Sequence, residues 1–260
     1  MKTENTEHIS LQKITDLLAS IGVMLISNGA NSTRTSRNLK RIAAAYNVSI
    51  ESFFSHAAVV LTVTDSESDR YVTQVKSIPH YGVNYSIVSE ISILSWEIAE
   101  QKPSLAVVEE ELEDIKHLNS YPEWFKFVFI GIATAALAKV FDGTNLEFVI
   151  AFFAGLLGIL GRKVLQMKKY NVNICWFFGA FVSTSVVNAC RLFGLQDFHS
   201  ALTACVLWLI PGVPLINGFL DIFSGHVVSG WAKLAMGFLM VFMIAVGFYL
   251  SIILFGYGSF

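Results

Sequence analysis

The stretch LWLIPGVPLINGFLDIFSGH, Leu207 to His226, decides how the chain folds. It begins as an apolar run of the kind that crosses a membrane, and it then places Pro211, Gly212 and Pro214 in the middle of that run. In hydrocarbon every polar backbone group needs a partner, so helix breakers are tolerated only where protein or a water-filled cavity satisfies the groups they free. The stretch therefore predicts a membrane helix with a break inside it.

The composition around this stretch divides the chain in two. The whole chain has 260 residues, of which 54% are hydrophobic, and its mean hydropathy of +0.57 is too high for an ordinary soluble domain. Residues 1–124 carry a net charge of −6, whereas residues 125–260 carry +4. We therefore expect a soluble domain over residues 1–121 and a transmembrane domain over residues 122–260. The polar N-terminus lacks the features of a secretory signal, which predicts a cytoplasmic soluble domain.

The soluble domain is predicted to be α+β. Apolar residues recur at helical spacing over residues 9–27, and a second helix begins at the good capping residues Asn31 and Ser32. Two runs rich in β-branched residues, 57–65 and 70–78, flank the turn residues SESD and predict a β-hairpin. Two further helices are expected over residues 85–101 and 104–118. The predicted order of elements is ααββαα.

The transmembrane domain is predicted to be all-α with five transmembrane helices. The expected spans are residues 125–141, 146–161, 172–193, 198–219 and 231–256, the fourth broken at Pro211/Pro214. Arg162, Lys163 and two more lysines stand between the second and third spans, and positively charged loops stay in the cytoplasm. This predicts a multi-pass protein of the cell inner membrane with a cytoplasmic N-terminus and the C-terminus outside.

The break itself admits two interpretations. A half-helix that begins at Leu215, Ile216 and Asn217 would present free N–H groups and a positive dipole end to an anion. Discontinuous helices of this kind hold substrate carboxylates in many transporters. Alternatively, the prolines only kink the span, or the span ends at Ile210 and PGVP is an interfacial turn. We take Pro211, Gly212, Pro214 and Asn217 as candidate substrate-binding residues.

Four further polar residues are candidates in the apolar half of the chain. Asp221 and His226 could relay protons if both faced a cavity, and Asp221 is also a candidate substrate-binding residue; alternatively, the two mark the inner interface. Thr184 and Asn188 share one helix face at a spacing of four residues. They would either bind substrate or form hydrogen bonds between helices.

The sequence predicts no enzyme. It contains no Gly-rich phosphate loop, zinc-protease helix or nucleophile elbow, so we expect no catalytic residues, metal or cofactor, and no nucleic-acid partner. A predicted helix carries Arg34, Arg37, Lys40 and Arg41, which would bind anionic lipid headgroups or an acidic metabolite, or else form a solvated face.

Four stretches of the chain resemble the threonine/serine exporter family, and in particular the longer component of its split, two-protein form. These stretches are NGANSTRTSRNLKRIAAAYNV (28–48), SHAAVVLTVTD (55–65), GVNYSIVSEI (82–91) and IPGVPLINGFLDIFSGHVVSG (210–230). The resemblance implies a cytoplasmic α+β domain, five spans and a separate small integral-membrane subunit. It also implies export of C4-dicarboxylates such as succinate, with threonine and serine as the alternative substrates.

The expected function is therefore that of an inner-membrane exporter subunit for small carboxylates, driven by the proton gradient and working as an oligomer in the lipid bilayer. An alternative of another class is a membrane-anchored sensor or assembly protein. Breakers and polar residues within the predicted spans argue against an anchor, which plain Leu and Val could provide.

Overall fold

The structure is a computed structural model that describes residues 2–55, 57–78, 82–118, 121–191 and 198–255. By contacts the chain forms two compact units. The first comprises Met1–Ser120 together with Val213–Ala235, and the second comprises Tyr121–Gly212 together with Met236–Phe260. The C-terminal segment Val213–Ala235 thus packs with the N-terminal part of the chain. The predicted end points at residues 193, 256 and 260 lie outside the described residues.

The first unit combines a three-stranded sheet with helices. Its elements up to residue 120 are α1 (Lys2–Ser27), α2 (Ser32–Ala45), β1 (Val48–Phe54), β2 (Ala58–Asp65), β3 (Tyr71–Ser77), α3 (Tyr85–Gln101) and α4 (Leu105–Lys116). The α+β character and the predicted hairpin, now β2 and β3, are confirmed. The predicted order ααββαα is wrong by one strand, because β1 precedes the hairpin and gives ααβββαα.

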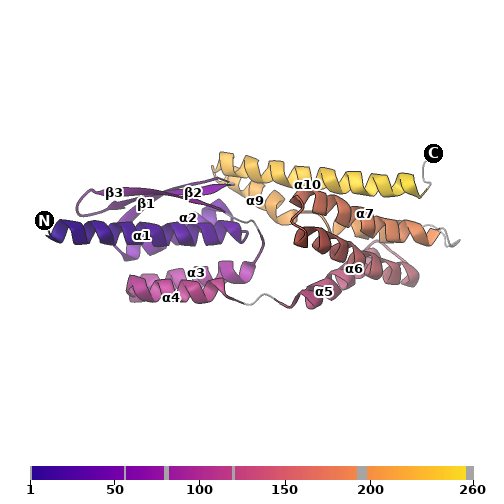
Figure 1. The fold of residues 1–260 in the computed structure, drawn as a ribbon, viewed down its shortest axis with the longest axis horizontal. Coiled ribbons are helices and arrows are strands. Elements are labelled where there is room, and N and C mark those ends of the chain that lie inside the picture. Colours follow the sequence, from indigo (N-terminus) through magenta and orange to yellow (C-terminus); the bar gives the residue numbers. More distant parts are fainter. Residues whose placement is uncertain (1, 56, 79–81, 119–120, 192–197, 256–260) are drawn as a thin grey trace. The chain divides into compact units, whose positions relative to one another are not determined.

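Strand β1 forms because its residues alternate between the two faces of the sheet. Val48 and Ile50 are buried, whereas Ser49 and Glu51 between them are exposed. The strand pairs antiparallel with β2, with Ile50 opposite Val63, so the sheet has the order β1-β2-β3. The alternation puts the apolar face of the sheet on α1 and α2, and α3 and α4 lie on the other side of α1 (Figure 1).

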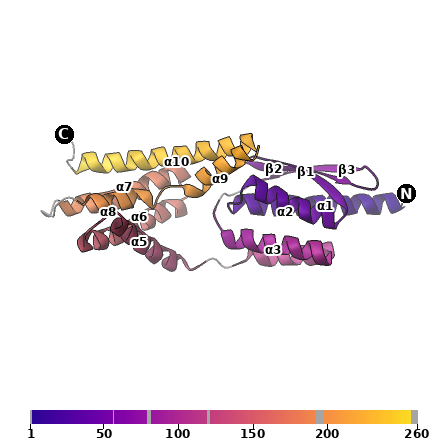
Figure 2. The ribbon, with the colours of Figure 1, turned by 180° about the vertical axis from the view of Figure 1, so that it is seen from behind.

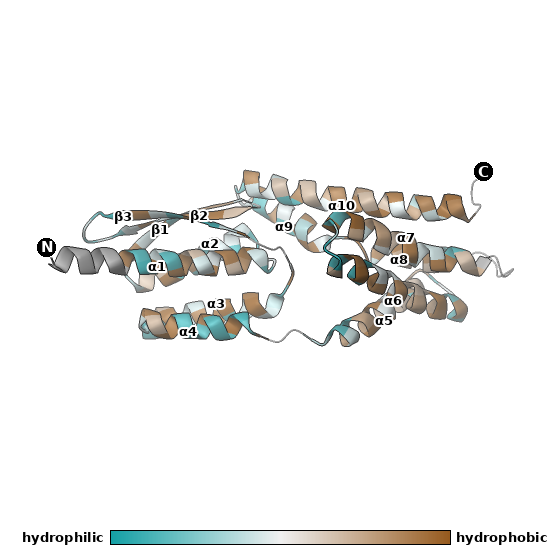
Figure 3. Cartoon of the chain, viewed as in Figure 1, coloured by the Kyte–Doolittle hydropathy of each residue, from teal (hydrophilic) through white to brown (hydrophobic). Residues whose placement is uncertain are grey.

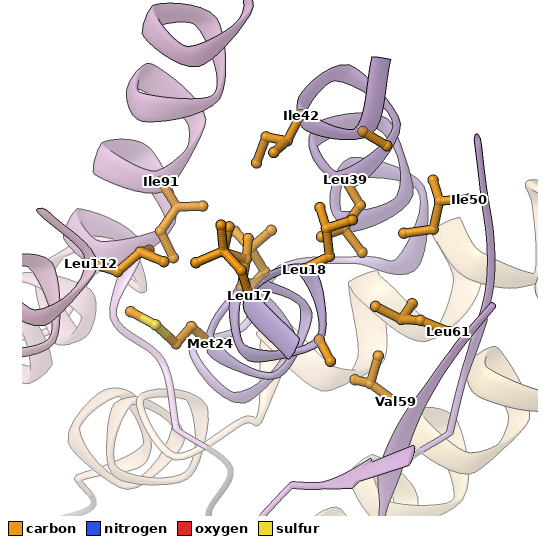
Figure 4. Close-up of a cluster of buried hydrophobic side chains, with 14 of the residues drawn as sticks. Leu17, Leu18, Met24, Leu39, Ile42, Ile50, Val59, Leu61, Ile91 and Leu112 are labelled. Atoms are coloured by element: carbon orange, nitrogen blue, oxygen red, sulfur yellow. The ribbon is translucent and has the colours of Figure 1, made fainter. Parts of the chain in front are cut away.

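The core of the first unit lies around α1. Leu18, Ile21 and Leu25 of α1 are fully buried, at the spacing that places them on one helix face. In Figure 4, Leu18 lies beside Leu39 of α2, and Leu61 of β2 lies further out on the same side of α1. Met24 lies on the side of Ile91 and Leu112. The figure labels Leu17, Leu18, Met24, Leu39, Ile42, Ile50, Val59, Leu61, Ile91 and Leu112. Helix α1 therefore lies at the centre of this core, and its end determines the position of the loop that follows it.

The second unit consists of helices. They are α5 (Glu123–Val140), α6 (Asn145–Met167), α7 (Val172–Arg191), α8 (His199–Leu207) and the C-terminal part of α10 (Val227–Leu254); α9 (Gly212–Phe223) belongs almost entirely to the first unit. The views from the two sides agree that α6 and α7 lie side by side (Figures 1 and 2). Glycines allow close helix contacts: a Cβ on Gly158 would lie 2.8 Å from Ser183 Cβ, and one on Gly247 would lie 2.4 Å from Phe177 O.

Three helices of the described chain are long and apolar enough to cross a membrane. They are Asn145–Met167, Val172–Cys190 and Val227–Leu254, and the pair α8 and α9 meets the same criterion when the two are taken together. The colouring in Figure 3 shows that hydrophobic residues predominate along these helices. This supports a multi-pass membrane protein, while the count of five spans stays a prediction. Helix α5, where the first span was predicted, carries Glu123, Lys126 and Lys139 and is not among the three.

Candidate functional site

Helices α9 and α10 form a tight hairpin after the two prolines. Gly225 has a φ of 86°, which lets the chain reverse between Phe223 and Val227. The helices then touch at two glycines, since a Cβ on Gly230 would lie 2.6 Å from the carbonyl oxygen of Gly218. Because nothing larger than glycine fits at this crossing, the polar residues beside it on the two helices are brought into direct contact.

The carboxylate of Asp221 is the centre of this contact. Asp221 is 0% exposed, and its Oδ2 lies 2.6 Å from Nζ of Lys233, which is itself 2% exposed. Ser229, one turn before Lys233 on α10, donates a hydrogen bond from its hydroxyl to the same carboxylate oxygen at 3.1 Å. The hairpin thus contains an ion pair from which water is excluded.

The start of α2 completes the coordination of this carboxylate. The backbone N–H of Ser32 donates to Asp221 Oδ1 at 2.8 Å, and its hydroxyl donates to Oδ2 at 2.7 Å. Ser32 is the first residue of α2, whose N-cap Asn31 accepts a hydrogen bond from the N–H of Arg34. The N-terminus of a helix carries a partial positive charge, so it stabilises the carboxylate alongside Lys233.

The loop that leads into α2 is fixed at the same place. Asn217 of α9 donates from its side-chain amide to the carbonyl oxygen of Gly29 at 2.7 Å, and Asn217 is 6% exposed. Gly29 has a φ of 96°, a conformation that side chains rarely adopt. The chain before α3 also joins this loop, because the N–H of Gly82 donates to the carbonyl oxygen of Ser27 at 2.7 Å.

Three of the four sequence stretches that carry the family resemblance therefore meet around one loop. The loop 28–32 belongs to the first stretch, Asn217 and Asp221 to the last, and Gly82 to the third. Strand β2, which contains most of the second stretch, pairs with β1, whose Phe54 packs edge-on against His226 with ring centroids 6.2 Å apart. We call this constellation of Ser32, Asp221, Ser229 and Lys233, with Asn217 and Gly29 beside it, the Asp221 site.

The prolines lie at the entrance to this hairpin. Helix α8 ends at Leu207 and α9 begins at Gly212, so Pro211 precedes α9 and Pro214 is its third residue, where a backbone N–H has no partner within the helix. The half-helix was predicted to begin at Leu215, and it begins at Gly212 instead. The side chain of Asn217 therefore contributes to the Asp221 site, and its N–H is no longer among the first four of the helix.

The structure shows other partners for His226, which was considered as a proton-relay residue together with Asp221. Its backbone N–H donates to the carbonyl oxygen of Asp221 at 2.8 Å, while its ring packs against Phe54. Within the described residues, no hydrogen bond joins the His226 ring to the Asp221 carboxylate. The cationic partner of that carboxylate is the ammonium group of Lys233 instead.

Thr184 and Asn188 lie in the second unit, on α7. The Thr184 hydroxyl donates to the carbonyl oxygen of Ala180 in its own helix at 2.7 Å, so it does not bridge helices. The Asn188 side chain donates to the hydroxyl of Ser251 on α10 at 2.9 Å, and its amide oxygen is buried without a hydrogen-bond partner. Asn188 thus links two helices, which is the second of the two roles considered for it.

The sequence pattern identified Asp221 and Asn217 but missed Ser32, Ser229 and Lys233. Lys233 gave a usable signal, because a single cation in an apolar helix requires a partner, and Asp221 is the acidic residue nearest to it in sequence. Ser229 stands four residues earlier on the same helix face. The contribution of Ser32 comes from 189 residues away and has no local signal.

A buried pair of this kind can do two things. The two charges neutralise each other, so the buried site has no net charge. When Asp221 moves away, Lys233 and the N-terminus of α2 are available to another carboxylate. Removing either charged partner would leave the other one buried and uncompensated, at a cost of about 3 to 5 kcal/mol. Within the described residues no group of three His, Cys, Asp or Glu side chains could hold a metal ion.

Comparison with known proteins assigns the chain to a family of transporters. The chain is 28% identical over 248 residues to the "Probable succinate transporter subunit YjjP" of Escherichia coli, and the match covers 94% of this chain and 95% of that protein. The protein of the same name from Klebsiella aerogenes is 28% identical over 94% of both chains.

Longer relatives match the chain over about half of their length. The "Threonine/serine exporter" of Corynebacterium glutamicum is 24% identical over 88% of this chain and 48% of its own length, and the "Probable threonine/serine exporter" of Mycobacterium tuberculosis is 20% identical over 95% and 47%. No solved structure matches the chain. The family model described as "ThrE: Putative threonine/serine exporter" matches residues 16–255. With the apolar helices and the match over nearly its whole length, the chain belongs to the threonine/serine exporter (ThrE) family.

Proposed function

We propose that this protein is a subunit of an inner-membrane exporter of small carboxylates, with C4-dicarboxylates such as succinate as substrates and a small integral-membrane protein as its partner. The substrate class is supported by the relatives that this chain matches from end to end, which are named as subunits of a succinate transporter. The names of these relatives contain the word subunit, which supports a partner protein. The longer exporters, which are about twice the length of this chain, support it too.

The observation that carries the proposal is the buried pair of Asp221 and Lys233. A substrate carboxylate has the same charge and donor requirements as the Asp221 carboxylate, so it can take the place of Asp221 on the Lys233 ammonium group and on the N–H of Ser32. A displaced Asp221 is then free to bind a proton, and His226 is the group proposed to exchange it with water. In this scheme the proton gradient drives export.

The other candidate residues have places in the same scheme. Pro211, Gly212 and Pro214 break the fourth of five spans, and Asn217 is proposed to bind substrate beside Asp221. Thr184 and Asn188 on the third span are proposed to line the substrate path, where the unpartnered amide oxygen of Asn188 is available to a donor. The proposed topology places a cytoplasmic domain, residues 1–121, before the spans and the C-terminus outside, and the exporter works as an oligomer.

A second substrate class is favoured by one feature of the same site. A zwitterionic amino acid needs both an anion and a cation, and Asp221 and Lys233 provide one of each. The longer relatives are named as exporters of threonine and serine. Export of these amino acids is therefore the alternative to dicarboxylate export.

An efflux assay tests both. Cells that lack the gene are loaded with labelled succinate, threonine or serine, and export is measured after re-expression of the chain with and without its small partner. We expect succinate export that requires both proteins and falls when a protonophore collapses the gradient. Unchanged export of all three compounds after deletion and re-expression would refute the proposal, and export of threonine and serine alone would establish the alternative.

The same assay separates the Asp221 site from the rest of the chain. Lys233→Met and Asp221→Asn are expected to abolish export while the protein remains in the membrane. Lys163→Met is the matched control, because Lys163 pairs with Glu123 at 2.8 Å on the surface, where both side chains are more than one third exposed. Full export by Lys233→Met would exclude Lys233 from the substrate path.

A further inference from the structure

A second polar cluster lies between α2 and α3, and it involves other side chains of α2 than the Asp221 site does. Asn38 of α2 is 2% exposed and Ser95 of α3 is fully buried, and Ser95 donates from its hydroxyl to the Asn38 side-chain oxygen at 3.3 Å. Asn38 in turn donates from its amide nitrogen to the hydroxyl oxygen of Ser92 at 3.2 Å. We call this row of Asn38, Ser92 and Ser95, with the arginines described next, the α2/α3 seam.

Among the described residues, the side-chain hydrogen bonds of two guanidinium groups in the seam all go to neutral oxygens. Arg34 donates to the Ser92 hydroxyl oxygen from Nε at 3.3 Å and from Nη2 at 3.1 Å. Arg41 donates from Nη1 to the Ser95 hydroxyl oxygen at 2.6 Å and to the Asn38 side-chain oxygen at 3.2 Å. The Arg41 guanidinium also lies 3.7 Å from the centre of the Trp96 ring. Both cations are thereby oriented before any ligand arrives.

The positive charge of the seam is not compensated within the described chain. No carboxylate of a described residue lies within ion-pair distance of Arg34, Arg37 or Arg41. Burial, together with the nearby positive charge of Arg37, lowers the pKa of Arg41 below its ordinary value. Lys40 is a further exposed cation on the same helix. Arginines that are held in place without an acidic partner, one of them stacked on an aromatic ring, are suited to bind an anionic ligand.

Much of the remaining hydrogen-bonding capacity of the seam consists of donors. Ser92 donates its own hydrogen to the carbonyl oxygen of Val88 at 2.8 Å and accepts from both Arg34 and Asn38, so its oxygen has no capacity left. Each guanidinium group has five N–H donors, and the contacts described use only some of them. A ligand that matches these donors must bring acceptors and negative charge, as a carboxylate or a phosphate does.

We propose that the α2/α3 seam binds a small oxyanion with two negative charges, the class to which C4-dicarboxylates and phosphate groups belong. Arg34 and Arg41 hold the anion by paired N–H donors, and Arg37 adds a third positive charge near Arg41. Identifying a dicarboxylate as the ligand rests on the proposed function, whereas the anion site itself does not. The seam would then be a second place where the exporter meets its substrate, separate from the Asp221 site.

Binding to the purified full-length chain tests this without any transport measurement. The chain is placed in nanodiscs of zwitterionic lipid, and calorimetry is performed with succinate, with inorganic phosphate and with sodium chloride as the control. Arg34→Gln and Arg41→Gln are each expected to weaken binding of the dianions by about tenfold or more, because each removes a charge-assisted bidentate contact. Lys13→Gln on α1 removes the same charge from an exposed position and should leave binding unchanged.

A further variant guards against loss of the fold. Ser92→Glu supplies an internal carboxylate next to Arg34, so it should keep or raise the melting temperature while it abolishes anion binding. Nanodiscs with anionic lipid distinguish the source of the anion: a headgroup in the seam would weaken succinate binding by the parent protein relative to nanodiscs of zwitterionic lipid. Binding of no probe, or equal binding by the parent and by all three seam variants, would overturn the proposal.

The seam and the proposed function can fail separately. Succinate binding without succinate efflux would leave the anion site standing and refute the export of dicarboxylates. Succinate efflux with no anion bound to the seam would support the export of dicarboxylates and refute the anion site.

Discussion

Replacing Lys233 with methionine is the most direct test of the energetics of the Asp221 site. Methionine has a similar length and no charge, so the change removes the ammonium group that lies 2.6 Å from the Asp221 carboxylate. The carboxylate keeps three neutral donors, the N–H and hydroxyl of Ser32 and the hydroxyl of Ser229. At 0% exposure it has no access to water in place of the lost cation.

The expected cost is large because the remaining charge stays buried. Loss of one partner of a buried ion pair destabilises proteins by about 3 to 5 kcal/mol, and the three remaining donors place this variant near the lower end of that range. The double variant Asp221→Asn with Lys233→Met removes both charges while keeping an acceptor for Ser32. It should recover most of the loss, because replacing both partners by neutral groups is often close to neutral.

Native-state hydrogen exchange of the solubilised chain can measure these free energies locally. Amides at the start of α2 and in α10 report the opening of this region, because both helices contribute donors to the carboxylate. Lys163→Met is again the control, and its exposed pair with Glu123 should contribute less than about 1 kcal/mol. The reasoning fails if the double variant is destabilised by the sum of the two single changes within about 0.5 kcal/mol, since the two charges would then be uncoupled.

Three further changes test other parts of the fold. Gly230→Ala puts a Cβ 2.6 Å from a backbone oxygen and should lower the free energy of unfolding by about 1 to 3 kcal/mol. Gly212→Ala is the control, because its Cβ meets nothing within 4 Å and its stability should match that of the parent. Equal melting temperatures of the two variants would contradict the close crossing of α9 and α10. Glu147→Gln should lower the free energy of unfolding by about 1 to 3 kcal/mol. The carboxylate accepts hydrogen bonds from backbone N–H groups at the starts of both α6 and α8, and an amide has only one oxygen for them. An unchanged melting temperature would contradict this. Asp16→Asn should lower stability slightly at pH 7 and not at acidic pH, because the bond from Lys76 lowers the pKa of Asp16 below its ordinary value of 3.8. The stabilisation from this ion pair is therefore present above pH 3.8 and is lost as the pH falls through the lower pKa of the folded state. A loss of stability independent of pH would contradict the ion pair.

Local patterns in the sequence predicted most of the elements of the first unit. The β2 and β3 hairpin was predicted from alternation and turn residues, and α1 and α2 from helical spacing and caps. Strand β1 was missed although Val48 and Ile50 alternate with polar residues, because the run is short and ends in two consecutive phenylalanines. A strand of this length is decided by its pairing with β2, which is a tertiary contact.

The candidate site was predicted only in part for the same physical reason. Asp221 and Asn217 attracted attention as polar residues in an apolar run, but their partners Ser32 and Gly29 lie nearly 190 residues earlier. Lys233 lies near the start of the fifth predicted span, where the positive-inside rule accounts for a cation without a partner. The close glycine crossing that brings Lys233 to Asp221 depends on the backbone path of two helices.

The packing of Val213–Ala235 with the N-terminal part of the chain also determines how this protein can be dissected. A fragment that stops at residue 120 would lack the carboxylate acceptor of Ser32 and the amide donor to Gly29. The smallest piece that keeps these contacts joins residues 1–120 to residues 213–235 through a linker. Such a splice, which omits most of the apolar helices, is the fragment to attempt for crystallography or for ligand titration of the α2/α3 seam.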